Sequence, residues 1–419
     1  MNRDRPGRGG LRRTFRALTI PNYRLFFAGQ LVSITGTWMQ RVAQDWLILE
    51  VGGGPLELAV GVGLQSLPTL FLGVWGGLLV DRVRHVRVTF VLTQAAMAVL
   101  AVLLGGLVVS GHVTLAAIYA TALTAGVVAV VDSPARQSFV LEMVGPDEAA
   151  NAISLNSSIN NAARLTGPAV AGLLIATAGT GVAYFVNAAS FLAIIGALLL
   201  MRVERLSPRV PESRGRGQVL AGFRYVWGER EIRAALAATL VVSMLSQNFR
   251  VTLPVLATTV LHGGPGMYGS LMSFVGVGAV AGALICAYLA SPSLRMIAVE
   301  GVAFGAALCV ASLVGSYPLA LVLMLALGAG NTSFNTTSNA LVLLSSEPRM
   351  RGRVLSIRAL VSNGATPVGS LLIGWVCEVA GVRAGLLVGG VAAVVASLFV
   401  VAVARRGPGR TPAGDAGQV

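Results

Sequence analysis

Charged side chains occur inside long apolar segments of this chain, where chemistry is the usual reason to keep them. Residues 25–49 contain Arg41 and Asp45, an arginine and a carboxylate one helical turn apart. An unpaired charge in hydrocarbon costs at least ~2.5–3.5 kcal/mol, so such groups face a wet cavity or one another. Because an acid that gains and loses a cationic partner changes its proton affinity, Asp45 is a candidate proton-coupling site. A permanent Arg41–Asp45 bridge is the alternative.

Amide-rich stripes in other apolar segments predict a polar cavity. Asn156, Asn160 and Arg164 recur at i, i+4 and i+8, so they share one helix face. Arg164 lies nearer the middle of its segment than Asp45 and is a candidate for attracting an anionic or polar substrate group. The alternative is hydrogen bonding between packed helices without a ligand. The candidate cavity residues are Thr37, Gln40, Arg41, Gln44, Asn156, Asn160, Arg164, Gln247, Arg250, Asn331, Asn335 and Asn363.

The segments that position these residues are long enough to cross a membrane as helices. The 419 residues are 55% hydrophobic and only 11% charged, and a span needs about 20 apolar residues. The apolar runs lack the alternation of membrane strands, so the predicted fold is all-α with twelve transmembrane helices. The expected spans are 25–49, 58–80, 87–110, 114–133, 149–177, 182–201, 234–260, 268–290, 296–315, 318–344, 353–380 and 384–404.

The arginines predict the topology. Apart from Arg41, Arg164, Arg250 and Arg383, all lie in alternate gaps between spans, and Lys is absent. Short positive loops stay in the cytoplasm. We therefore expect a multi-pass protein of the cell's inner (plasma) membrane with both termini in the cytoplasm. The net charge of +14 is distributed over short loops beside the spans, which favours membrane lipids over nucleic acid as its partner.

Two pseudo-symmetric six-helix bundles are expected. Gly53-Gly54-Pro55 and Gly263-Gly264-Pro265 follow corresponding first helices, which suggests parallel repeats with a site between them. The expected divisions are a basic cytoplasmic tail 1–20, an N-terminal bundle 21–202, a central cytoplasmic linker 203–233, a C-terminal bundle 234–405 and a cytoplasmic tail 406–419.

Enzyme chemistry is not indicated. The chain has no phosphate loop, H-E-x-x-H or G-x-S-x-G motif. Cys286, Cys309 and Cys377 lie inside predicted spans without metal-ligand spacing. We therefore expect no catalytic residues, cofactor or metal site.

Two motifs carry a family resemblance. The loop after the second span contains Gly77, Asp81 and Arg82, and resembles the G-x-L-x-D-R-x-G-R signature of the major facilitator superfamily, with Arg84 where Gly is usual. The fifth span contains Gly167, Pro168 and Gly172, similar to the G-P-x-x-G-G helix motif of that superfamily's exporters. Pro168 lacks an N–H and is expected to kink the helix.

Further short sequence motifs narrow the resemblance to the enterobactin-exporter-like branch of drug:proton and siderophore efflux transporters. They include Asp132-Ser133-Pro134-Ala135-Arg136 and Arg351-Gly352-Arg353-Val354. The resemblance implies proton-coupled export of a small amphipathic drug, antibiotic or siderophore. It also implies an inward-side gate around Asp81, with Gly77, Arg82, Asp132, Arg136 and Arg353 as its other residues. We expect a monomer whose partners are a small-molecule substrate, protons and lipids. An importer or lipid transporter of the same fold, or a non-transporting scaffold, is the alternative.

The topology can be tested by cysteine labelling of intact cells. In a background without native cysteines, an impermeant thiol reagent should label Gly54→Cys and leave Gly215→Cys unlabelled until the membrane is permeabilised. The Arg distribution is the physical reason. Labelling at position 215 but not at position 54 would reverse the topology.

Overall fold

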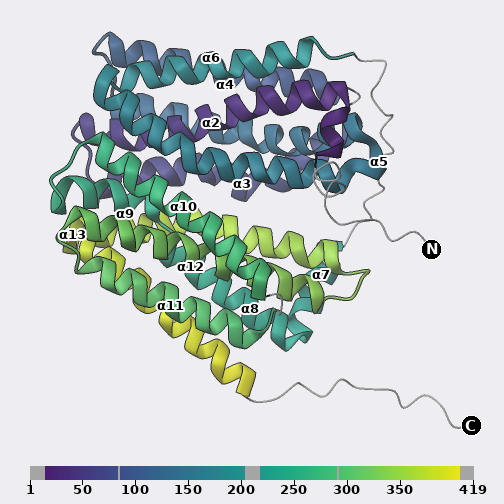
Figure 1. Cartoon of the computed structure of the whole chain (residues 1–419), viewed down its shortest axis with the longest axis vertical. Coiled ribbons are helices and arrows are strands. Elements are labelled where there is room, and N and C mark those ends of the chain that lie inside the picture. Colours follow the sequence, from purple (N-terminus) through teal and green to yellow (C-terminus); the bar gives the residue numbers. More distant parts are fainter. Residues whose placement is uncertain (1–14, 84, 203–217, 290–291, 406–419) are drawn as a thin grey trace, which may run out of the picture.

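The N-terminal half is a bundle of long helices. The computed structural model describes residues 15–83, 85–202, 218–289 and 292–405; Arg84, most of both predicted tails and residues 203–217 of the predicted linker lie outside these ranges. A 3-10 turn, η1 (Arg16–Thr19), precedes α2 (Pro21–Glu50), α3 (Pro55–Arg82), α4 (Val86–Val109), α5 (Leu115–Ala178) and α6 (Thr180–Leu199). In Figure 1 these purple-to-teal helices lie together on one side of the molecule.

The C-terminal half forms the second bundle. A short helix, α7 (Gln218–Gly228), precedes α8 (Arg230–Val241), η3 (Val242–Ser246), α9 (Phe249–Val255) and η4 (Leu256–Val260), which together make one span. The remaining helices are α10 (Pro265–Leu289), α11 (Leu294–Ser312), α12 (Tyr317–Leu344) and α13 (Arg351–Arg405). These green-to-yellow helices lie on the other side of the molecule in Figure 1.

Two of the helices each hold two spans. The backbone of α5 breaks at Gly145 (φ 69°) and that of α13 at Gly381 (φ 81°). Both angles lie in the left-handed region that glycine enters without steric cost. Each glycine therefore reverses the chain in place of a longer loop.

The number of spans agrees with the sequence prediction. In the described ranges, 9 segments are long and apolar enough to cross a membrane, and one of them, Arg351–Val403, contains the break at Gly381 and so two spans. The helices that fall short of that apolar limit, α2 and residues 146–178 of α5, carry much of the predicted polar stripes. Counting the double segment twice and adding these two gives twelve, so the all-α fold of twelve spans is confirmed.

The two bundles meet near one end of the molecule. We call the end with the turns at 51–54, 110–114 and 261–264 the arginine-poor end, and the end with Arg82, Arg202 and Arg349 the arginine-rich end. Toward the arginine-poor end, Ser370 of α13 donates to the Ala59 carbonyl of α3 at 3.2 Å, and the Glu378 carboxylate accepts from the Leu56 N–H at 3.4 Å. These bonds hold α3 against α13.

A second contact between the bundles uses the predicted fifth-span motif. A Cβ at Gly172 of α5 would lie 3.1 Å from Gly269 Cα and 3.0 Å from the Pro265 carbonyl oxygen, both in α10. The same motif faces the other way at Gly167, where a Cβ would meet the Trp38 side chain of α2 at 2.6 Å. Small residues here let three helices approach closely.

Filling the α5–α10 contact should separate the bundles at the arginine-poor end. A Cβ at Gly269 would lie 2.7 Å from Gly172 Cα, so Gly269→Val must displace backbone rather than a flexible side chain. We expect oxidative cross-linking between Leu56→Cys and Glu378→Cys to fall several-fold in this variant. The matched control is Gly106→Val in α4, where an added Cβ would have no atom of another described helix within 4 Å. Equal cross-linking in the two variants would contradict the assigned contact.

Candidate functional site

A buried ion pair joins the two bundles. Asp45 of α2 is fully buried, and its carboxylate accepts two bonds from Arg250 of α9, from Nε to Oδ2 at 2.9 Å and from Nη2 to Oδ1 at 2.7 Å. The Tyr268 hydroxyl of α10 donates to Oδ2 at 2.8 Å. Both carboxylate oxygens are thus satisfied from the opposite bundle by a bidentate, charge-assisted pair.

The same arginine also binds a third helix. Arg250 Nη1 donates to Gln65 Oε1 of α3 at 2.8 Å. Arg250 therefore ties α9 to α2 and α3 at once. A buried pair of this kind adds little net stability over apolar packing, but loss of one partner leaves an uncompensated buried charge. The Asp45–Arg250 pair can form only where the two bundles are in contact, because its two residues lie in opposite bundles.

The partner of Asp45 differs from the expected one. Arg41 lies one turn before Asp45, but its guanidinium is over the Trp38 ring at 4.7 Å from the centroid. An arginine placed before an acid at i, i+4 is the weaker orientation for a helical ion pair. Arg250 approaches from the facing helix and can match the carboxylate with two parallel bonds. The expectation of an Arg41–Asp45 pair is wrong for this reason.

A polar cavity lies next to the ion pair, between the bundles. Its volume is about 400 Å³, and α2, α3, α4, α5, α6, α9 and α13 contribute to its wall. The seventh span is interrupted at Gln247 and Asn248, between η3 and α9, and both residues line it. Discontinuous helices commonly form transport sites at such repeat interfaces. The sequence-predicted residues that line it are Thr37, Gln40, Arg41, Gln44, Gln247, Arg250 and Asn363.

The other predicted cavity residues do not line this cavity. Asn160 donates to the Asn156 carbonyl at 3.0 Å and Asn335 to the Asn331 carbonyl at 2.9 Å, so both amides bond within their own helices. Arg358 of α13 donates to the Asn335 carbonyl at 2.8 Å. Arg164 is half-buried beside α10 and forms no ion pair with any residue that the structure describes.

Two of the predicted gate residues form a network inside the N-terminal bundle. Asp132 of α5 pairs with Arg136 and accepts bonds from Thr93 at 2.7 Å and Gln94 at 2.6 Å, both on α4. Ser33 of α2 bonds to Gln94 at 3.3 Å. This buried network ties α2, α4 and α5 together.

The remaining gate residues lie near the arginine-rich end. Gly77, Asp81 and Arg82 occupy the end of α3, where a Cβ at the neighbouring Gly76 would run into the Val130 carbonyl of α5. Arg353 lies at the start of α13, where its guanidinium contacts the Met350 sulfur at 3.4 Å and a Cβ at Gly222 of α7 would lie 3.2 Å from its Cβ.

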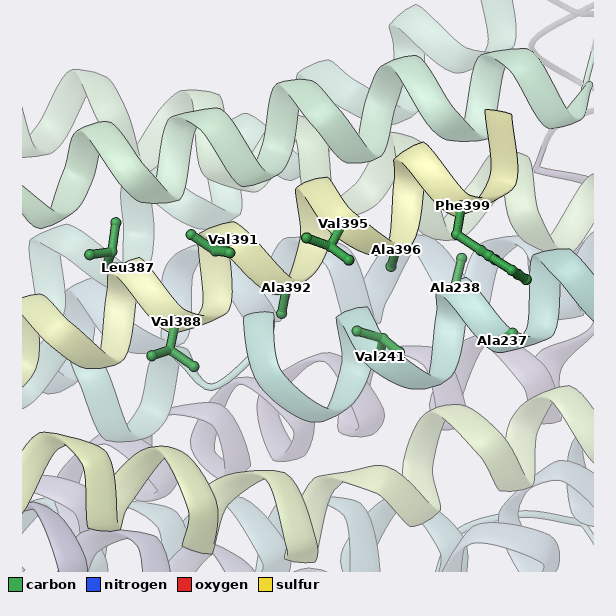
Figure 2. A pocket seen from close by; sticks show the side chains of 10 residues that line it. All are labelled: Ala237, Ala238, Val241, Leu387, Val388, Val391, Ala392, Val395, Ala396 and Phe399. Atoms are coloured by element: carbon green, nitrogen blue, oxygen red, sulfur yellow. The ribbon is translucent and has the colours of Figure 1, made fainter. Parts of the chain in front are cut away.

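An apolar groove lies elsewhere and has a different character. Figure 2 shows the side chains of 10 residues from α8 and α13 around it, all Ala, Val, Leu or Phe. Val395 and Phe399 are more than half exposed. A surface of this kind on a membrane helix faces lipid chains, so we do not regard the groove as a site for a polar molecule.

Several site residues were missed by sequence reasoning. Gln65, Ser66 and Thr69 of α3 and Asn187 of α6 line the cavity, but both spans are predominantly apolar and the sequence prediction assigned a polar face to neither. Tyr268 lies one turn into α10, where an aromatic residue suggests a membrane interface. One signal in the sequence could have indicated that the second span lines the cavity: Gln65 is the single amide in that span.

Comparison with known proteins agrees with this architecture. The solved structure of a bacterial homolog of the human lysosomal transporter Spinster, in an inward-facing and unoccupied conformation, matches with a TM-score of 0.74 at 13% identity, covering 92% of this chain and 97% of that chain. The nucleoside transporter NupG matches with a TM-score of 0.74 at 12% identity, covering 92% of this chain and 99% of that chain. These matches show that the chain shares its fold with solved transporter structures.

The family follows from the sequence. Residues 13–409 match the transmembrane secretion effector family of major facilitator proteins, and the chain belongs to that family. The staphyloferrin A transporter of Staphylococcus aureus is 24% identical over 86% of this chain and 90% of its own length. The multidrug efflux pump Tap of Mycobacterium tuberculosis is 27% identical over 88% of this chain and 89% of its own length. The protein is therefore a multi-pass membrane transporter and not an enzyme.

The ion pair should behave as a coupled unit in unfolding experiments. Asp45→Ala leaves Arg250 buried without its carboxylate, which should cost about 3–5 kcal/mol and lower the melting temperature in detergent. Adding Arg250→Ala should recover part of this loss, because the unpaired charge is gone. Melting-temperature losses that simply add in the double variant would show that the two residues do not interact.

Proposed function

We propose that this transporter is a proton-coupled exporter that moves small amphipathic molecules out of the cell by alternating access. The observation that carries the proposal is a polar cavity between two bundles, closed beside the arginine-poor end by the Asp45–Arg250 pair. The proposed membrane is the cell's inner (plasma) membrane, with both termini and the 203–233 linker in the cytoplasm and the protein acting as a monomer. In this topology the structure corresponds to the outside-closed state.

Asp45 is the proposed proton-coupling residue. The Asp45–Arg250 pair, with Tyr268, is made only while the bundles touch at this end. When the outer side is open, Asp45 takes up a proton from outside; closure re-forms the pair with Arg250 and releases that proton toward the cytoplasmic side. A ligand can move such an equilibrium only through different affinities for its two states, and the pair supplies that difference.

A substrate in the cavity would act on the same pair from the inside. Arg250 both binds Asp45 and lines the cavity, so a substrate that attracts the guanidinium weakens the contact between bundles. Substrate bound from the inside opens the outer side, and the proton that Asp45 takes up outside is carried inward on the return step, so substrate exit alternates with proton entry. Asp81 and its neighbours at the arginine-rich end are the proposed gate for the opposite side, and the α5 motif is the proposed hinge.

The relatives support export over the alternatives. A multidrug efflux pump is among them, and the family description refers to secretion. An importer or lipid transporter would use the same bundles in the reverse direction. A scaffold has no need for the polar cavity. The remaining predicted stripe residues, Asn156, Asn160, Asn331 and Asn335, are proposed to stabilise their helices.

Asp45→Asn should separate coupling from transport. A substrate would first be identified from a panel of drugs and siderophores in an efflux-deficient host. In proteoliposomes, we expect this variant to lose uphill export driven by a pH gradient and to keep substrate exchange without a gradient, because the amide cannot carry a proton.

The matched control is Glu50→Gln on the same helix, whose carboxylate accepts from Thr180 inside its own bundle at 2.7 Å. That variant should keep uphill export. Persistent pH-driven export by Asp45→Asn would place the coupling site elsewhere.

A further inference from the structure

The charge of the cavity wall is unbalanced. Among the described residues that line it, Arg41 and Arg250 carry charge, and none is Asp or Glu. Arg250 is neutralised by Asp45, which lies fully buried behind it. The cavity therefore carries the net positive charge of Arg41.

Arg41 is held in place but not neutralised. It forms no ion pair with any residue in the described ranges, and its guanidinium is over the Trp38 ring. Stacking on an aromatic face leaves the N–H groups at the edge of the guanidinium plane. These donors have the fork geometry that matches a carboxylate with two parallel bonds.

Two amides in the same wall have donors without acceptors. Gln44 is 3% exposed and its Nε2 has no hydrogen-bond partner, and the same is true of the buried Nε2 of Gln247 in the opposite bundle. Gln44 lies three residues after Arg41, on the same helix face. Buried donors without acceptors are rare and costly, so a ligand rich in acceptor oxygens is the natural complement.

We propose that the cavity binds an organic carboxylate, with one carboxylate on Arg41 and further oxygens on Gln44 and Gln247. This rests on the proposed function in taking the cavity as the substrate site. A cationic amphiphile would face Arg41 with no acid to receive it, and Phe191 is the only aromatic side chain among the described residues of the wall. A phosphate, with its higher charge, would require a second free guanidinium, and Arg250 is already bound by Asp45 and Gln65.

Binding to the purified full-length protein in detergent tests the proposal. Equilibrium dialysis would use radiolabelled citrate as the carboxylate, tetraphenylphosphonium as the cation, inorganic phosphate and glucose. We expect saturable binding of citrate above the other three. Arg41→Gln should weaken citrate binding about 10- to 100-fold, the usual strength of a charged hydrogen bond, and Arg41→Lys should weaken it less.

The matched control is Arg164→Gln, since Arg164 is an arginine of α5 that also has no ion pair in the described ranges but does not line the cavity. This variant should bind citrate within about twofold of the wild type, in line with substitutions away from a site. Gel filtration and circular dichroism of each variant verify its fold.

The proposal would be overturned by tighter binding of tetraphenylphosphonium or phosphate than of citrate, by unchanged citrate binding in Arg41→Gln, or by loss of citrate binding in Arg164→Gln. Absence of saturable citrate binding in the folded wild type would also overturn it. The test needs no pH gradient, so it is independent of the coupling mechanism. Citrate binding lost in Arg41→Gln, together with flux insensitive to pH, would retain this inference and remove proton antiport.

Discussion

The bidentate bond between Asp45 and Arg250 is the interaction on which the rest of the site depends. It crosses from α2 to α9 at 2.7 and 2.9 Å, and Gln65 and Tyr268 complete the coordination from α3 and α10. Two charges in the membrane interior must be paired or hydrated. When the bundles separate, water or a ligand must replace these contacts. Contact between the bundles at this end and the ionised state of Asp45 therefore favour each other.

The other features of the structure serve that equilibrium. Glycine contacts between α5 and α10, and hydrogen bonds between α3 and α13, bring the bundles close enough for the pair to form. Inside the N-terminal bundle, the Asp132 network holds α4 and α5 to α2. The N-terminal bundle can then move as a rigid body, with the Asp132 carboxylate satisfied internally. The cavity beside Arg250 gives a substrate access to the same bond.

The sequence predicted the fold and much of the cavity, because spans and polar stripes are local patterns. Thr37, Gln40 and Gln44 follow helical spacing on α2, and all three line the cavity. The partner of Asp45 could not be predicted, because Arg250 is 205 residues away and helix packing decides which arginine reaches the carboxylate. Asn160 and Asn335 shared the same spacing signal, but their amides bond to their own helices. The roles of the gate residues remain predictions.

The most direct test of the central claim is the distance between the bundles at the arginine-poor end. Nitroxide labels at His112→Cys and Gly264→Cys, in a background without native cysteines, would be measured by double electron–electron resonance in nanodiscs. We predict a short distance between the labels at mildly alkaline pH, a longer one at mildly acidic pH, and the longer distance at both pH values in Asp45→Asn. The same short distance in Asp45→Asn and in the parent protein at mildly alkaline pH would contradict it.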